Sequence, residues 1–152
     1  MDELTAAPAF TLSLSVAPSD IDELGHASNI AYVRWLQDVA VAHSSAVGLG
    51  YARYVELGGV FVIRRQEIDY LRSALRGDTL LLRTRVCNVA AAKCHRETEI
   101  VRAADDVVLA RGLTTWGYVD IATGRPSRIP DSVRVAFGVA LRPKRGDFSA
   151  PR

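Results

Sequence analysis

The chain has 152 residues, of which 49% are hydrophobic and 24% are charged. These values are typical of one globular domain, and they exclude a disordered, collagen-like or disulfide-dense protein. A net charge of +2 is too small to indicate nucleic-acid binding. No apolar run approaches the roughly 18 residues of a membrane span, and the start Met1-Asp2-Glu3 is acidic where a signal peptide is basic. We therefore expect a cytoplasmic protein without nucleic-acid or membrane partners.

The first third of the chain predicts a strand, a loop and a long helix. Phe10 to Val16 alternates apolar and polar residues, which is the period of a half-buried strand. Ala17 to Gly25 has the Pro, Ser, Gly and acidic residues of a loop. Ser28 or Asn29 can cap a helix, and Ile30 to Val47 then lacks Pro and Gly and has apolar residues on more than one face. We expect this helix to be mostly buried.

The rest of the chain predicts a short helical turn followed by β structure. The four expected strands are separated by turn residues, and they indicate an antiparallel meander. The expected order gives an α+β fold with one helix against one sheet, in a single domain spanning residues 1–152 with its core at about 10–140. The expected segments are a helical turn (Tyr51–Leu57), strands (Val60–Leu71, Thr79–Val89, Cys94–Ala103, Val107–Val119), a turn (Asp120–Pro130), a terminal helix (Asp131–Val139) and a loose tail (142–152).

The densest cluster of reactive groups precedes the long helix, in the run from Asp20 to Asn29. A helix N-terminus presents unpaired backbone N–H groups and the positive end of the helix dipole, so it can polarise a carbonyl oxygen. A carboxylate beside it could attack the carbonyl or deprotonate water. The alternative is that these acids only cap the helix and carry surface charge.

The run D-x-D-x-x-G-H-x-x-N-x-x-Y, from Asp20 to Tyr32, resembles the signature of the 4-hydroxybenzoyl-CoA thioesterase-like branch of the hotdog-fold superfamily. The likeness covers roughly residues 10 to 137. It implies a long central helix wrapped by a curved antiparallel sheet, and a homodimer or a dimer of dimers with active sites at the subunit interface. The likeness continues through Ile68-Asp69-Tyr70-Leu71, Gly77-Asp78-Thr79-Leu80, Thr115-Trp116 and Asp120-Ile121-Ala122-Thr123-Gly124-Arg125-Pro126.

The resemblance also implies roles for individual residues of the loop. Asp22 corresponds to the family's catalytic carboxylate, and the backbone N–H near Asn29 would hold the thioester carbonyl. Gly25 would let the backbone turn without a Cβ clash. His26 and Tyr32 would shape the pocket. His26 could also act as a catalytic base, although a lone His in a loop is more often structural. Many relatives have two Asn residues where this chain has Ser28-Asn29.

The activity that the resemblance implies is hydrolysis of an acyl thioester of coenzyme A. No metal or redox cofactor is implied, since coenzyme A is part of the substrate. Of the 19 basic residues 17 are Arg, which suits bidentate phosphate binding. Arg85 and Arg96 flank the expected hairpin near Ala90 and are candidates for the coenzyme phosphates. The acyl group, and the choice between nucleophile and general base for Asp22, stay open.

Several alternatives compete with this interpretation. Asp38 lies in an L-x-D-x-A setting similar to another branch of the superfamily, where the acid is inside the helix. The chain could instead be a thioesterase for acyl carrier protein, a non-catalytic acyl-CoA-binding module, or a hotdog hydratase or dehydratase. The last is disfavoured, because its D-x-N-P-[LI]-H pattern is absent.

The two cysteines are Cys87 and Cys94, and neither has a partner at metal-ligand spacing. In a tight hairpin centred on Ala90-Ala91 they would lie opposite each other, so a disulfide is geometrically conceivable. The cytoplasm favours two reduced thiols. Cys94 and His95 are adjacent in a strand and point to opposite faces, which excludes a Cys–His dyad.

Overall fold

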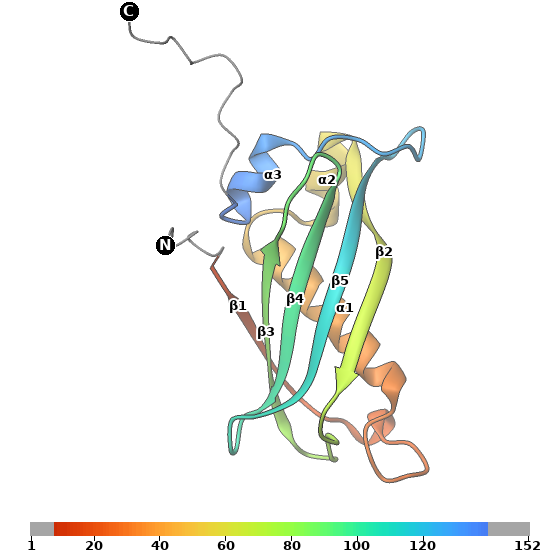
Figure 1. Ribbon diagram of the computed structural model, residues 1–152, viewed down its shortest axis with the longest axis vertical. Coiled ribbons are helices and arrows are strands. Elements are labelled where there is room, and N and C mark those ends of the chain that lie inside the picture. The colour runs from red at the N-terminus through yellow and green to blue at the C-terminus, as the bar shows by residue number, and fades with distance from the viewer. Residues whose placement is uncertain (1–7, 140–152) are drawn as a thin grey trace, which may run out of the picture.

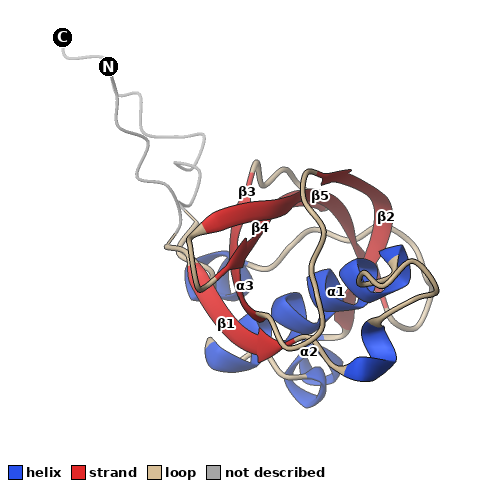
Figure 2. Ribbon diagram, turned by 90° about the horizontal axis from the view of Figure 1, so that it is seen from below, coloured by secondary structure: helices blue, strands red, loops and turns tan. Residues whose placement is uncertain are grey.

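The computed structural model describes residues 8–139. The tail expected to be loose from Arg142 onward lies outside the described residues. A curved antiparallel sheet wraps around one long helix, as expected (Figures 1 and 2). The elements are β1 (Phe10–Ser15), a 3₁₀ turn (Pro18–Asp20), α1 (Asn29–Ala46), α2 (Tyr51–Leu57), β2 (Gly59–Tyr70), β3 (Thr79–Cys87), β4 (Lys93–Arg102), β5 (Val107–Asp120) and α3 (Asp131–Ala136).

The sheet is not the simple meander that the sequence predicts. Its strand order is β1-β3-β4-β5-β2, so β2 pairs with β5 instead of β3. Short turns join β3 to β4 and β4 to β5, and these force neighbouring strands to pair. The connection from β2 to β3, residues 71–78, is longer and crosses the lower end of the sheet to reach β3, which pairs with β1 (Figure 1). β2 therefore forms one edge of the sheet.

The core lies between α1 and the concave face of the sheet. Trp35, Leu36 and Val39 on α1 are at most 3% exposed and belong to the same apolar cluster as Leu80 on β3. Gly112 on β5 permits this approach, because a Cβ there would lie 2.9 Å from Leu36 Cδ1. The absence of a side chain at this position lets the helix pack directly on the sheet.

Only one face of α1 is buried, which corrects the expectation of a mostly buried helix. Ile30, Val33 and Val41 are 71%, 40% and 58% exposed. The reason is geometric, since the sheet of one subunit contacts a single side of the helix. The opposite side carries apolar residues that nothing in this chain covers among the described residues 8–139.

The convex face of the sheet is charged and solvated. Its side chains form cross-strand ion pairs such as Arg85–Glu97 and Arg111–Glu99, with N–O distances of 2.9 and 3.6 Å. Exposed pairs of this kind contribute little to stability. Within residues 8–139, no helix is long and apolar enough to cross a membrane.

Candidate active site

The loop between the 3₁₀ turn and α1 is a tight reversal closed by backbone hydrogen bonds. The Asp22 N–H donates to the His26 carbonyl at 2.9 Å, and the Gly25 N–H donates to the Asp22 carbonyl at 3.1 Å. Gly25 has a φ of 79°, which is a left-handed conformation that a residue with a Cβ rarely adopts. Glycine at this position therefore makes the reversal possible, as the sequence predicted.

Asp22 itself lies on the exposed surface of this loop. Its Oδ1 accepts the Leu24 N–H at 2.9 Å, which holds the carboxylate against the loop backbone. Within the described part of the chain, Oδ2 has no hydrogen-bond partner. The carboxylate is thus oriented by one oxygen and open to a ligand or water through the other.

The start of α1, which follows this loop in the chain, offers a free donor. Ser28 caps the helix by accepting the Ile30 N–H at 3.2 Å. Among residues 8–139, the Asn29 N–H donates to no protein group, and the Asn29 side chain is exposed. A free N–H at the positive end of an 18-residue helix is suited to hold an oxygen that gains negative charge.

Asp20 positions the loop, a role that sequence reasoning missed. Its side chain is only 5% exposed and forms an ion pair with Arg34 on α1. Oδ2 accepts the Ala17 N–H at 2.9 Å, and the Asp20 carbonyl accepts the Ser28 N–H at 2.8 Å. Asp20 therefore fixes the loop to the first turns of α1. The sequence signal that could have indicated this role is Asp20 itself, the first acid of the D-x-D motif.

Loss of the Asp20 carboxylate is expected to destabilise the protein. In Asp20→Ala the Ala17 N–H and Arg34 lose their acceptor, so the free energy of unfolding should fall by about 1–3 kcal/mol. Urea unfolding measures the change. Glu23→Ala is the control in the same exposed loop, and it should change stability by less than about 0.5 kcal/mol. Equal effects of the two substitutions would show that Asp20 does not anchor the loop.

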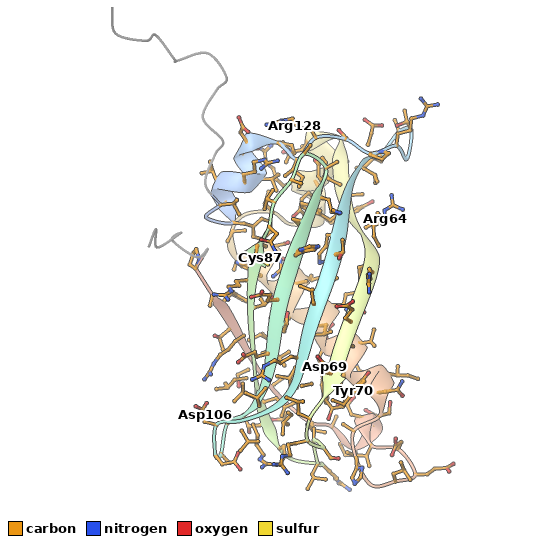
Figure 3. The ribbon with its side chains drawn as sticks, viewed as in Figure 1. Arg64, Asp69, Tyr70, Cys87, Asp106 and Arg128 are labelled. Carbon is orange, nitrogen blue, oxygen red and sulfur yellow. The ribbon has the colours of Figure 1, made fainter. Side chains whose placement is uncertain are left out.

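The two remaining loop and helix residues predicted for the site have different surroundings. His26 is exposed, and its carbonyl closes the loop. Tyr32 is 3% exposed, and its hydroxyl accepts the Ala74 N–H at 3.0 Å. Its ring packs edge-on against Tyr70, which lies at the lower end of β2 (Figure 3). Tyr32 thus anchors the connection between β2 and β3 from within the core, because α1 turns this position toward the sheet.

Arg85 and Arg96, the two candidates for binding the coenzyme phosphates, lie on different faces of the sheet. Arg85 lies opposite Glu97 on the convex face and donates to it through Nε and Nη2, at 3.0 and 2.9 Å. Arg96 lies opposite Val86 and is 5% exposed on the concave face. Their positions in adjacent strands differ by an odd step of the register, so their side chains lie on opposite faces.

The cysteines also lie on opposite faces. Cys87 pairs with His95 in the strand register, one residue away from the register expected for a hairpin centred on Ala90-Ala91. Asn88 takes a φ of 47° at the start of this turn. Both thiols are free, and burial raises the pKa of Cys94 to about 12. The expected geometry for a disulfide is therefore wrong, and Cys94 stays a protonated thiol at neutral pH.

Asp38, the rival acid, lies on the exposed face of α1, more than two turns beyond the helix start. It forms no ion pair with the described residues. No free helix N–H lies beside it, because its own backbone is inside α1. Asp22, in contrast, lies in the loop that leads into the start of α1.

A second feature, which we call the inner cavity, lies between the second half of α1, α2 and the concave face of the sheet. Its volume is about 320 Å³, near the lower end for small-molecule pockets. Figure 1 shows α2 at the end of α1 opposite the Asp22 loop. The lining residues are Gln37, Ala40, Val41, Ser44, Ser45, Leu49, Gly50, Tyr51, Tyr54, Val60, Phe61, Val86, Cys94, Arg96, Trp116 and Phe137. In the described range, no group of three or more His, Cys, Asp or Glu could hold a metal ion.

Comparison with solved structures places this architecture in the hotdog fold. A thioesterase for 1,4-dihydroxy-2-naphthoyl-CoA from Synechocystis superposes with a TM-score of 0.79 at 20% identity, over 86% of this chain and 96% of that one. A DHNA-CoA thioesterase from Staphylococcus aureus gives 0.73 at 17% identity, over 79% and 80%. The S. aureus protein SAV2348, solved in complex with CoA, gives 0.81 at 15% identity, over 94% of each chain.

The sequence itself defines the family. The model of the Thioesterase-like superfamily matches residues 16–137, which include the Asp22 loop, α1 and the whole sheet except β1. The chain belongs to the Thioesterase-like superfamily and is a thioester hydrolase.

Proposed function

We propose that this protein hydrolyses acyl-CoA thioesters to a free acid and coenzyme A, with Asp22 as the reactive carboxylate. Two observations carry the proposal: the exposed Asp22 carboxylate is oriented by one N–H, and the Asn29 N–H is unpaired at the start of α1, the helix that follows the same loop. One group can act on the carbonyl carbon or on water, while the other stabilises the oxygen that becomes negative.

Two routes fit this pairing, and both consume one water. As a general base, Asp22 takes a proton from water, the hydroxide attacks the carbonyl carbon, and the C–S bond breaks to release the thiolate. As a nucleophile, Asp22 attacks the carbonyl carbon, expels the thiolate and forms a mixed anhydride that water then hydrolyses. In either route the Asn29 N–H would hold the carbonyl oxygen, and the products are an acid and a thiol.

Coenzyme A is the proposed carrier of the acyl group, supported by the fold shared with a protein solved in complex with CoA. The test is a graded panel of acyl-CoA thioesters, with release of free thiol as the signal. The same acyl groups on acyl carrier protein form the comparison arm. Turnover only on the carrier protein would contradict the proposed carrier, and binding without any turnover would contradict a hydrolase.

The protein is also expected to assemble as a homodimer. β2 is an edge strand, and α1 carries the exposed apolar residues Ile30, Val33 and Val41. Unpaired edges and apolar faces of this kind are typically covered by a second subunit. Analytical ultracentrifugation at micromolar concentration should show a dimer or a dimer of dimers. A stable, active monomer would refute this expectation.

A further inference from the structure

The inner cavity contains a buried positive charge that has no carboxylate partner. Arg96 on β4 is 5% exposed and lines the cavity. Both of its hydrogen bonds start at Nη1 and end on neutral acceptors, His43 Nδ1 at 2.9 Å and Thr84 Oγ1 at 3.1 Å. Among residues 8–139, no Asp or Glu forms an ion pair with Arg96. Buried charges are normally paired, because leaving water costs an ion several kcal/mol.

The other titratable groups around this guanidinium supply no negative charge at neutral pH. Burial lowers the pKa of Arg96 to about 10, so the side chain stays protonated. The neighbouring Cys94 thiol has its pKa raised to about 12 by burial, and burial also raises the pKa of Tyr54. His43 has its pKa lowered to about 4 by burial and by the charge of Arg96, so it is neutral.

A second donor in the same wall also lacks an acceptor. The Trp116 indole N–H is buried and, within the described part of the chain, has no hydrogen-bond partner. Trp116 lies on β5, next to β4, and lines the cavity together with Arg96. Arg96 Nε and Nη2 likewise have no acceptor among the described residues. The donors that a ligand in the cavity could reach are therefore those of Arg96, whose guanidinium lies 5.7 Å from the centroid of the Phe137 ring. The Trp116 N–H is enclosed by protein atoms in the adjoining wall.

We propose that the inner cavity binds an apolar group that carries a carboxylate, with Arg96 as its counter-ion and Trp116 in the adjoining wall. The aromatic walls bury the apolar part, and the guanidinium binds the acidic end. This inference rests on the proposed function for one point only, which is that the ligand is the acyl group of a thioester. The carboxylate would then lie at the end of the acyl group remote from the thioester.

The position of the cavity defines how such an acyl group meets the reactive carboxylate. From Asn29 to Ser44, α1 rises by about 22 Å at 1.5 Å per residue, and the Asp22 loop lies at the far end (Figure 1). The nearest lining residue on α1, Gln37, is about 12 Å of helix rise from Asn29. The ligand would therefore place its carboxylate in the cavity and its thioester outside it, toward an Asp22 loop of the same subunit or of a second copy of the chain.

Binding of a free acid tests the proposal without any turnover. Phenylacetate is the probe, and phenylacetamide is its uncharged match of nearly equal shape. Isothermal titration of the wild-type protein should show phenylacetate binding at least about tenfold more tightly than the amide, as expected for a charge-assisted contact. Equal affinities, or no binding of either compound, would overturn the proposal.

Two further measurements locate the acid. Arg96→Met keeps an unbranched side chain and should weaken phenylacetate binding by at least about tenfold, whereas Arg111→Ala on the convex face should not change it. In wild-type protein the Trp116 indole N–H resonance, identified by its loss in Trp116→Phe, should shift on adding phenylacetate, and that of Trp35 should not. This NMR readout stands even if Arg96→Met does not fold. An unshifted Trp116 resonance at saturating acid would overturn the assignment.

Turnover separates this inference from the proposed function. The wild type should prefer 4-carboxyphenylacetyl-CoA over the corresponding 4-carboxamide thioester in kcat/KM, and Arg96→Met should remove the preference. Asp22→Asn should abolish hydrolysis of both thioesters and leave phenylacetate binding unchanged. Acid binding without hydrolysis of any thioester would contradict the proposed function alone. Hydrolysis without preference for the carboxylate would contradict the cavity assignment alone.

Discussion

Asp22→Asn is expected to lower kcat for thioester hydrolysis by at least about 10²-fold, because a positioned acid–base or nucleophilic group typically contributes that much. The substitution keeps the loop, since the amide oxygen can still accept the Leu24 N–H that Oδ1 accepts at 2.9 Å. What it removes is the negative charge and the basicity of the group. Steady-state kinetics on the best thioester of the panel measures the effect, and urea unfolding verifies that stability is retained.

Asp38→Asn is the matched comparison for this prediction. Both acids are exposed, but Asp38 lies within α1 and has no free helix N–H beside it. Its substitution should therefore cost far less activity. If Asp38→Asn abolishes turnover and Asp22→Asn does not, the acid inside the helix is the reactive one, and Asp22 only closes the loop.

The stability of the protein is expected to fall as the pH is lowered from about 6.5 to about 4, because of His43. This ring is 4% exposed and stacks on Phe10 with ring centroids 5.0 Å apart. Burial and the adjacent Arg96 lower its pKa from 6.5 to about 4. Since Arg96 can only donate, Nδ1 must accept and the ring must be neutral.

The sign follows from proton binding in the two states. Between the two pKa values the unfolded chain binds a proton at His43 and the folded chain does not, so acid favours unfolding. A shift of this size corresponds to about 3 kcal/mol. The contribution is fully present above pH 6.5 and absent below about 4. Urea unfolding at a series of pH values and one protein concentration measures it.

His43→Gln is the control for this effect. The Gln amide oxygen can accept from Arg96 and does not titrate, so the part of the pH dependence between 6.5 and 4 that His43 causes should disappear. Carboxylates titrate in both proteins and cancel in the comparison. Identical pH profiles for the wild type and His43→Gln would show that His43 is not the group responsible.

Local patterns in the sequence were sufficient to predict β1, α1 with its cap, and the chain reversal in the Asp22 loop. The alternation from Phe10 to Val16 predicted β1, and Ser28 with the following Pro- and Gly-free run predicted α1 and its cap. Gly25 predicted the reversal beside Asp22. These features depend on residues that are near each other in the chain, so backbone preference and periodicity identify them.

The tertiary structure alone decided the strand order, the hairpin register and the burial of two charged residues. Periodicity indicates that a strand has a buried face, but it does not identify the strand's partner. A slip of one residue exchanges the two faces. That slip places Cys87 opposite His95 and separates it from Cys94. The burial of Asp20 against α1, and of Arg96 in the inner cavity, likewise depends on contacts between residues distant in sequence, which no local pattern contains.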